Sequence, residues 1–389
     1  METRRKIAGN FKKFKELRPQ AFIFAKMQKE KPNIRTFSEA ELKSWLADQG
    51  EKAFRGRQIR EWLWKKHATA FDEMTSLSKE LRNKLKAHFR LPALQVSHLQ
   101  KSRDKTIKVG FRLEDDLLVE GVLIPSGGRY TACISSQVGC ALGCRFCATA
   151  RLGWNRNLVF DEIFDQVALL EKVCRENYQD KLDNIVLMGM GEPLQNYENV
   201  RKAIELLTGE GGPGYSPSRI TLSTVGIIKG IKRMADEQVK YNLAVSLHAA
   251  TDEKRSEIIP VNRQNNLEAL GRSLKYFHEK TGTRITLEYL LMDNFNDNPE
   301  DAAKLAVFCR QFPCKINLIP YNPVEGVPYK TSEELKTLRF KTLLEKRNLV
   351  VNIRQSRGTD IDAACGQLAN TLKKPGLRGK SGRPGTKTT

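Results

Sequence analysis

Cys140-Ala141-Leu142-Gly143-Cys144-Arg145-Phe146-Cys147 is the stretch that decides how this 389-residue sequence is interpreted. It places three thiols within eight residues, so one short loop could wrap one face of a metal cluster. Three ligands leave one iron of a [4Fe-4S] cube open, and the spacing therefore predicts a cluster with a free coordination position. The alternatives are a zinc site that Cys133 completes, or thiols that only pack in a core.

Outward from this loop, the sequence alternates between strands and helices. Strand-like runs are expected at residues 107–113, 117–124, 131–135, 184–188, 219–224, 241–247, 284–291, 315–319 and 349–353. The first two runs flank a turn at Asp115 and Asp116, and the later ones are separated by amphipathic helical stretches. This succession of βα units predicts an α/β fold with a parallel sheet. The repetition favours a partial (βα)6 TIM-like barrel over a doubly wound sheet.

Before these strands, residues 34–98 are expected to form a small helical domain. Ser38 and Glu41 form a capping-box pattern ahead of an apolar helical face. The apolar positions that continue the helical spacing are Leu42, Trp45, Leu46, Ile59, Trp62, Leu63, Phe71, Met74, Leu77, Leu81, Leu85 and Phe89, and Pro92 closes the set. We interpret the tryptophans as core residues, with stacking on nucleic-acid bases as the alternative.

The net charge of +21 is concentrated at the two ends of the chain. Residues 1–33 hold ten basic and three acidic residues, and residues 371–389 hold six basic and no acidic ones, so the ends carry +13. Such ends cannot bury much surface, and we expect a mobile arm and a mobile tail that attract RNA through counterion release. Basic ends that only promote solubility are the alternative.

Composition excludes several classes of protein. No apolar run approaches the ~18 residues that a membrane-spanning helix needs, and no segment at the N-terminus has the pattern of a secretory signal. We therefore expect a cytoplasmic protein without membrane contact, and an organelle transit peptide is the minor alternative. In a reducing compartment the eight cysteines are better explained as ligands or nucleophiles than as disulfides.

The cysteine motif, with Phe146 before its last cysteine, resembles the signature of the radical S-adenosylmethionine (SAM) superfamily. Further stretches make the chain similar to the RlmN/Cfr family of RNA methyltransferases within it. These stretches are Ser135–Cys140, Met188–Leu194, Thr221–Thr224, Ser246–His248 and Asp360–Leu368. The resemblance spans roughly residues 35–370 and identifies residues 99–370 as a radical SAM catalytic domain, with residues 34–98 as an RNA-binding accessory domain.

The resemblance also implies where the cofactors bind. Cys140, Cys144 and Cys147 would hold a [4Fe-4S] cluster, and SAM would chelate its open iron. The residues implied in SAM binding are Gly191, Glu192, Ser223, Ser246, Leu247, His248 and Asn322. Independently of the resemblance, most of these residues follow the ends of successive predicted strands, which places them on one rim of a parallel barrel.

Two more cysteines and one glutamate carry the implied chemistry. Adenine C2 is not nucleophilic, so its methylation needs a radical route. The resemblance implies two SAM molecules per turnover: one methylates Cys365, and the other yields a radical that activates this methyl group. Glu120 would remove the C2 proton, and Cys133 would then form a disulfide with Cys365 as the base leaves. Inert buried thiols and an ordinary surface carboxylate are the alternatives.

The implied substrates are one adenosine of 23S rRNA and the tRNA adenosine 3′ to the anticodon. An external one-electron reductant such as flavodoxin or ferredoxin would serve the cluster, and we expect a monomer. An adenine-C8 methyltransferase of the antibiotic-resistance type is the alternative within the family, although Glu192-Pro193 and residues 360–368 look more like the C2 enzymes. An iron-sulfur or zinc RNA-binding protein without catalysis and a glycyl-radical activase are the alternatives outside it.

Overall fold

The computed structural model describes residues 31–370. The arm expected over residues 1–33 lies outside this range apart from residues 31–33, and the tail at residues 371–389 lies outside it entirely. All eight cysteines fall within the range, and all are free thiols. Among the residues described, no helix is both long and apolar enough to cross a membrane.

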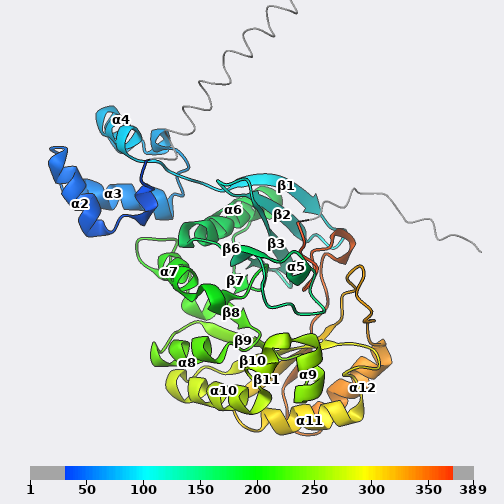
Figure 1. Ribbon diagram of the computed structural model, residues 1–389. Helices are drawn as coiled ribbons and strands as arrows, with labels where there is room; N and C mark the ends of the chain where they lie inside the picture. Colours follow the sequence, from blue (N-terminus) through cyan, green and yellow to red (C-terminus); the bar gives the residue numbers. More distant parts are fainter. Residues whose placement is uncertain (1–30, 371–389) are drawn as a thin grey trace, which may run out of the picture.

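The chain begins with a helical unit, which stands to one side of the molecule (Figure 1). It contains α2 (Glu39–Asp48), α3 (Phe54–Arg60), which continues into a π-helical turn, and α4 (Lys79–His88). The capping box at the start of α2 forms, since the Glu41 amide donates to Ser38 Oγ at 3.2 Å and the Ser38 amide to the Glu41 carboxylate at 2.7 Å. The predicted helical spacing fills the core of this unit with Leu42, Leu46, Ile59, Leu63, Leu81 and Leu85.

A ten-stranded sheet follows, and its strands lie in chain order. The antiparallel part is β1 (Gln95–Lys101), β2 (Ile107–Arg112) and β3 (Leu118–Ser126). The parallel part is β4 (Arg129–Cys133), β7 (Asn184–Leu187), β8 (Ile220–Thr224), β9 (Asn242–Ser246), β10 (Ile285–Leu291), β11 (Cys314–Pro320) and β12 (Val351–Ile353). Because the strand order never reverses, the sheet curls into a partial barrel rather than a doubly wound fold, as predicted.

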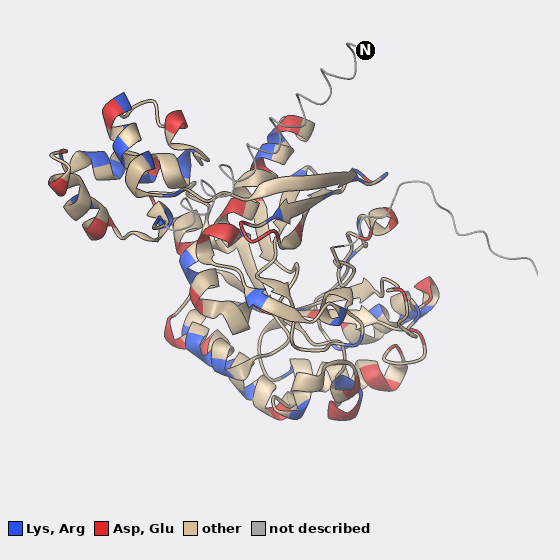
Figure 2. Cartoon of the chain, turned by 45° about the horizontal axis from the view of Figure 1, so that its top comes forward, with Lys and Arg blue, Asp and Glu red and all other residues tan. Residues whose placement is uncertain are grey.

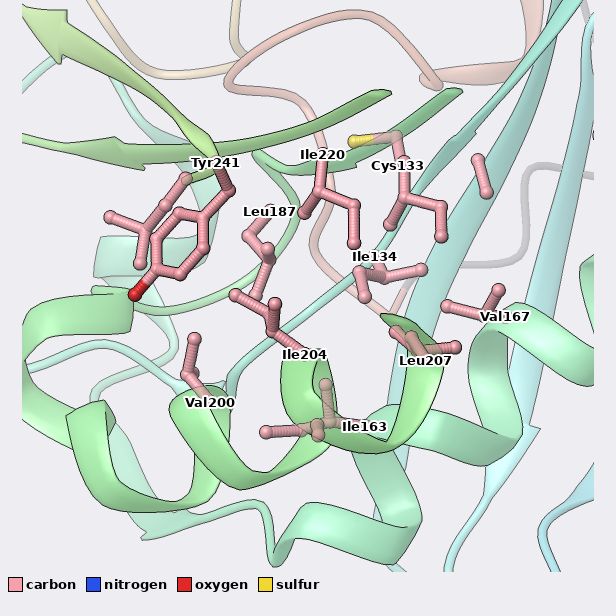
Figure 3. Close-up of a cluster of buried hydrophobic side chains, with 14 of the residues drawn as sticks. Cys133, Ile134, Ile163, Val167, Leu187, Val200, Ile204, Leu207, Ile220 and Tyr241 are labelled. Carbon is pink, nitrogen blue, oxygen red and sulfur yellow. The ribbon is translucent and has the colours of Figure 1, made fainter. Parts of the chain in front are cut away.

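Helices on the outside of the barrel cover the parallel strands (Figure 1). They are α6 (Phe160–Tyr178), α7 (Tyr197–Thr208), α8 (Ile228–Asp236), α10 (Leu267–Thr281), α11 (Pro299–Cys309) and α12 (Glu334–Glu345). The short helix α9 (Asp252–Ile258) lies at the rim instead, where the Arg145 amide donates to the Ile258 carbonyl at 3.0 Å. Side chains alternate along each strand, so Ile134 and Leu187 pack toward the helices, whereas the sulfur of Cys133 points away from them (Figure 3). The strands thus have an apolar outer face and a chemically distinct inner face.

Three strands were not predicted from the sequence. The edge strand β1 reads QVSHLQK and is mostly exposed, so it lacks the apolar alternation that marks a half-buried strand. The other two, β5 (Gln137–Gly139) and β6 (Trp154–Asn157), are too short for any period to be detected. They form a separate two-stranded sheet around the cysteine motif.

The helical unit is attached to the barrel through a buried ion pair. Arg35 Nη1 contacts both carboxylate oxygens of Asp165 on α6, at 2.7 and 2.8 Å. The same carboxylate accepts from the Leu94 amide at 3.1 Å and lies 3.0 Å from Nε2 of His67. Because these three groups converge on one carboxylate, this contact fixes the helical unit against α6.

Candidate active site

A cavity of about 790 Å³ occupies the interior of the barrel. Most of the residues predicted to form the site line it: Cys133, Cys140, Cys144, Cys147, Gly191, Glu192, Ser223, Ser246, His248 and Cys365. The lining also reaches the amino ends of the strands, where it includes Asn184, Arg219 and Lys315. The carboxyl ends of the strands therefore bring the predicted residues together at one rim.

The small sheet of β5 and β6 frames the cysteine loop. The Cys140 amide donates to the Gly153 carbonyl at 2.8 Å, which closes the loop at its base. Gly139 has φ +76°, and a side-chain carbon there would lie 1.9 Å from the same carbonyl, so only glycine fits. After Cys147 the chain enters α5 (Ala148–Arg151). These contacts fix the three cysteines on one side of the cavity.

The three motif thiols are buried enough to disfavour their ionised forms. Burial raises the pKa of Cys140 to about 11, and it also raises the pKa of Cys144 and Cys147. Thiolates are therefore stable here only when a metal neutralises them. No three His, Cys, Asp or Glu side chains within residues 31–370 converge closely enough for a single metal ion. A [4Fe-4S] cube instead takes one thiolate per iron, so this donor set fits a cube.

Arg255 places a positive charge behind the cysteine loop. Its side chain is fully buried, and it donates to the carbonyls of Leu247, Val225 and Ser246 at 3.1, 2.5 and 3.3 Å. A further bond of 2.6 Å joins it to the Asn262 side chain. Burial lowers the pKa of Arg255 to about 10, so it remains a cation at neutral pH. Such a charge complements the negative charge of a thiolate-bound cluster.

The stretch that precedes the motif positions the loop that follows β7. Ser135 Oγ accepts from the Met190 amide at 2.8 Å and donates to the Glu120 carbonyl at 2.6 Å. Gln137 Oε1 accepts from the Glu192 amide at 2.8 Å. Gly191 has φ +99° and lies so close to Gln137 that a side-chain carbon would clash at 2.6 Å. The glycine spacing after β7 is thus required by close packing against the strand that carries the cluster loop.

Glu192 is buried at the rim with both carboxylate oxygens engaged. Its Oε1 accepts from the Leu194 amide at 3.0 Å and its Oε2 from the Val225 amide at 2.9 Å. Burial raises its pKa to about 7 despite these bonds. The side chain is therefore well placed to accept further donors from a bound ammonium or ribose group, which fits the polar groups of SAM.

His248 closes the rim as a neutral ring. Its backbone has φ +57°, and its Nδ1 accepts from the Leu290 amide at 3.1 Å, which leaves the ring proton on Nε2. Burial lowers its pKa to about 3. The ring meets Phe146 edge to face, with centroids 4.8 Å apart. The aromatic residue of the cysteine motif thus packs against the end of β9. His248 provides this packing contact, and its Nε2 proton makes it an uncharged hydrogen-bond donor.

The segment that carries Cys365 is docked on the cysteine loop (Figure 1). The Ala148 amide donates to the Gly366 carbonyl at 2.7 Å, and Thr149 Oγ1 donates to the Leu368 carbonyl at 2.6 Å. Asn322 Nδ2 donates to the Cys365 carbonyl at 3.3 Å. Residues that lie early and late in the barrel sequence, on α5 and after β11, therefore hold Cys365 at the wall of the cavity. The three cluster thiols line the same cavity.

Arg354 lies in the same cavity and was not predicted from the sequence. Its Nη1 donates to Glu288 Oε2 at 3.2 Å, and Asn317 Nδ2 donates to the other oxygen of Glu288 at 2.9 Å. The nearby Cys365 raises the pKa of Arg354, and Glu288 adds to this effect. Burial raises the pKa of Cys133 to about 12, which Arg354 opposes. One guanidinium thus faces both thiols of the implied disulfide.

Three predicted residues do not line the cavity. Leu247 is fully buried in the core, and Asn322 holds the Cys365 segment instead. Glu120 lies on the inner face of β3 but is covered, because its Oε2 accepts from the Ala369 and Asn370 amides at 3.0 and 3.2 Å. A side chain on this face reaches the cavity only further along the strand, at Ile124 and Ser126. Lys108, which lies 3.3 Å from Glu120 Oε1, was also missed in the sequence.

Two family models match the chain. The N-terminal domain of ribosomal RNA large subunit methyltransferases matches residues 32–91, and the radical SAM superfamily matches residues 134–306. The first covers the helical unit, and the second covers the cluster loop and much of the parallel barrel. The division between the two matches lies within the antiparallel strands.

Known proteins are similar over most of the chain. A probable dual-specificity RNA methyltransferase RlmN from Cytophaga hutchinsonii is 52% identical, over 87% of this chain and 93% of its own length. The dual-specificity RNA methyltransferase RlmN of Anaeromyxobacter dehalogenans is 44% identical, over 87% of this chain and 92% of its own length. The crystal structure of a radical SAM methyltransferase from Sphaerobacter thermophilus is 40% identical and superimposes with a TM-score of 0.82, over 87% of this chain and 99% of that one.

Proposed function

Since the chain belongs to the RlmN family of radical SAM RNA methyltransferases, we propose that it methylates C2 of one adenosine in 23S rRNA and of the adenosine 3′ to the anticodon in tRNA. The protein is an enzyme, its cofactors are a [4Fe-4S] cluster and SAM, and its substrate is RNA. The observation that carries the finer proposal is that Cys365 and Cys133 line the same cavity as the three motif cysteines.

Cys140, Cys144 and Cys147 would hold the cluster, and Glu192 with the neighbouring rim residues would hold SAM. When bound, the two together supply a one-electron reductive cleavage of SAM that yields a deoxyadenosyl radical. Gly191, Ser223, Ser246 and His248 complete the polar wall beside Glu192. Ser223 and His248 are buried in this wall, and the exclusion of water protects a radical from side reactions.

Cys365 would act as the methyl carrier. As a thiolate it displaces the methyl group of one SAM, so that an S–C bond forms at Cys365 while the sulfonium S–C bond breaks. Transfer of a hydrogen atom from this S-methyl group to the deoxyadenosyl radical would leave a carbon radical that adds to adenine C2. Arg354 lines the same cavity as this thiol and is held there by Glu288.

Glu120 and Cys133 would complete the reaction. Glu120 would remove the C2 proton, and the adduct radical would give up one electron, for which the oxidised iron-sulfur cluster is a suitable acceptor. The Cys133 thiolate would attack the Cys365 sulfur, so that an S–S bond forms as the S–CH2 bond breaks, and a proton would complete the methyl group of the released base. Since Ala369 and Asn370 cover Glu120, the segment that carries Cys365 has to shift when the base enters. Restoration of both thiols then requires an external reductant.

Surfaces outside the cavity would bind the RNA and bring the target base to the cavity. The target base has to leave its stack to reach the cavity, which a single-stranded loop allows at little cost. We assign RNA binding to residues 34–98, whose helices carry many Lys and Arg side chains (Figure 2), and catalysis to residues 99–370. We also propose that the enzyme acts as a monomer in the cytoplasm, with flavodoxin or ferredoxin as its electron donor.

The experiment that tests this proposal is anaerobic reconstitution of the protein with iron and sulfide. It is then incubated with SAM, a reductant and either 23S rRNA or tRNA, and the nucleosides are analysed by mass spectrometry. We expect 2-methyladenosine from both RNAs. If 8-methyladenosine formed instead, the enzyme would methylate C8, and the proposed C2 regiochemistry would be wrong. Formation of deoxyadenosine without any methylated base would overturn the proposed substrates.

A further inference from the structure

A surface depression of about 510 Å³ lies against the cysteine loop. Its lining comes from the loop itself, from α5, from α9 and from the segment that follows β11: Gly143, Cys144, Arg145, Ala150, Arg151, Glu257, Gly326, Val327, Pro328 and Tyr329. Cys144 and Ala150 line both this depression and the inner cavity. The wall between bulk solvent and the cluster-binding face is therefore a single layer of residues at Cys144.

The lining of the depression carries two positive charges and one negative charge. Arg145 and Arg151 are exposed, and neither forms an ion pair within residues 31–370, whereas Arg156 on the same hairpin pairs with Asp115 and Glu162. Arg151 donates only to a backbone carbonyl. The one carboxylate of the lining, Glu257, accepts from the Tyr329 hydroxyl at 3.3 Å. Because two exposed guanidinium groups outnumber one carboxylate, the lining has a net positive charge that favours an acidic partner.

Apolar side chains adjoin these charges. Leu152 and Trp154 follow Arg151 in the chain and are 48% and 53% exposed, although large apolar side chains are usually buried. Val327 and Pro328 lie within the lining. Arginine and tryptophan are enriched in protein interfaces, and small patches that combine apolar contact with charge are typical of transient electron-transfer complexes.

We propose that this depression is the docking site for a small acidic electron-donor protein that reduces the cluster. The inference rests on the proposed function, because it takes Cys140, Cys144 and Cys147 as cluster ligands. In the encounter one electron passes from the reduced donor to the cluster, the donor is oxidised by one electron, and no bond forms or breaks. Electron transfer needs only a short path, which the single layer at Cys144 provides.

RNA is the other class of partner that arginines attract, but the geometry disfavours it here. Cys133 and Cys365 line the inner cavity and do not line the depression. A base held in the depression would therefore be separated from both thiols by the cysteine loop. A donor docked here would also leave the inner cavity free for SAM and the target base.

The test uses a bacterial flavodoxin and the reconstituted protein with both arginines reversed, Arg145→Glu and Arg151→Glu. We expect flavodoxin to bind roughly tenfold more weakly by calorimetry, with a flatter salt dependence, because two attractive charges become repulsive. Formation of deoxyadenosine should fall by a similar factor with flavodoxin as donor and stay unchanged with dithionite, which needs no docking. Lys229→Glu with Lys232→Glu on α8 is the matched control, since it makes the same charge change on exposed lysines that form no ion pair within residues 31–370.

The outcomes separate docking from the proposed function. Equal flavodoxin affinity for the wild type, the control and the reversed variant would overturn the proposal, and so would a loss of RNA affinity with flavodoxin affinity intact. Absence of deoxyadenosine from the wild type with dithionite would instead contradict the proposed cofactor chemistry. If the reversed variant loses iron, the binding measurement is repeated with the neutral variant Arg145→Gln and Arg151→Gln, which introduces no repulsive charge. Unchanged flavodoxin affinity in this neutral variant would also overturn the proposed docking.

Discussion

Two buried carboxylates of this protein, Asp165 and Glu120, are each paired with a buried cation but differ in how completely they are used. Asp165 receives Arg35 on both oxygens, His67 on one and the Leu94 amide on the other. Its side chain is only 2% exposed, and it joins the helical unit to α6. A carboxylate with every acceptor position engaged stabilises structure and has little capacity left for chemistry.

Glu120 is as deeply buried but less completely satisfied. Its Oε2 accepts from two backbone amides, whereas its Oε1 lies 3.3 Å from Lys108 Nζ without hydrogen-bond geometry, so neither of these two atoms has a hydrogen-bond partner within residues 31–370. The cation also differs, because arginine presents a planar set of donors to a carboxylate and lysine presents a single ammonium group. The contrast indicates that the Asp165 pair is a fixed joint, whereas the Glu120 pair leaves one carboxylate oxygen without a hydrogen bond.

The largest expected effect is on turnover. Glu120→Gln should lower the rate of RNA methylation by about 10²–10⁴-fold, the usual contribution of a general base, and leave SAM cleavage intact. Single-turnover assays with deoxyadenosine measured in parallel check this. Asp116→Asn, a change at an exposed carboxylate in the turn before β3, is the control. A Glu120→Gln enzyme that methylates RNA at the wild-type rate would remove Glu120 from the mechanism.

The next effect is on stability. Asp165→Asn should lower the free energy of unfolding by about 3–5 kcal/mol, because it leaves the guanidinium of Arg35 buried without its partner. Asp161→Asn is the matched control one turn earlier on α6, since burial already raises the pKa of Asp161 and favours its neutral form. Apart from the loss of its hydrogen bond to Asn33, we expect Asp161→Asn to lower the free energy of unfolding by less than about 1 kcal/mol. Equal losses in urea unfolding would contradict the assignment of Asp165 as the joint.

A smaller expected effect is the difference in stability between variants of the two ion pairs. Glu120→Gln should destabilise the fold by about 1–3 kcal/mol, less than Asp165→Asn, because the contact between Glu120 and Lys108 lacks hydrogen-bond geometry and the glutamine oxygen can still accept from the two backbone amides. The same unfolding measurement, carried out on both variants under identical conditions, gives the difference. If Glu120→Gln proved the more destabilised of the two, the contrast between the two pairs would be wrong.

The smallest effect is the pH dependence of the joint. Burial would raise the pKa of Asp165, but Arg35 and His67 outweigh burial and hold the pKa below its ordinary 3.8. Ionised Asp165 therefore contributes stability that is complete above pH 3.8 and is lost as the pH falls through the lowered pKa. The stability difference between wild type and Asp165→Asn should be constant from pH 7 to 5 and shrink only in stronger acid. A difference that shrinks near pH 6 would contradict this sign.

The sequence predicts those parts of the site in which residue type and spacing carry the signal. The cluster-binding face and its rim could be located from the cysteine motif, the glycines after β7 and the alternation of apolar residues along the strands. Metal ligation requires the cysteines, and close packing requires the glycines. Arg354, Lys108 and Arg255 could not be found in this way, because no spacing pattern in the sequence marks the partners that each of them meets in the folded chain. The same reason explains β1, whose polar sequence forms a strand only because β2 pairs with it.

The central claim is that Cys365 carries the methyl group and Cys133 releases the product. Cys133→Ala, incubated anaerobically with SAM, reductant and RNA, should accumulate a covalent protein–RNA adduct through Cys365, visible on a denaturing gel and mapped by peptide mass spectrometry. Cys133→Ala with Cys365→Ala should form no adduct and no methylated RNA. Normal release of 2-methyladenosine RNA by the Cys133→Ala enzyme, without an adduct, would contradict the claim.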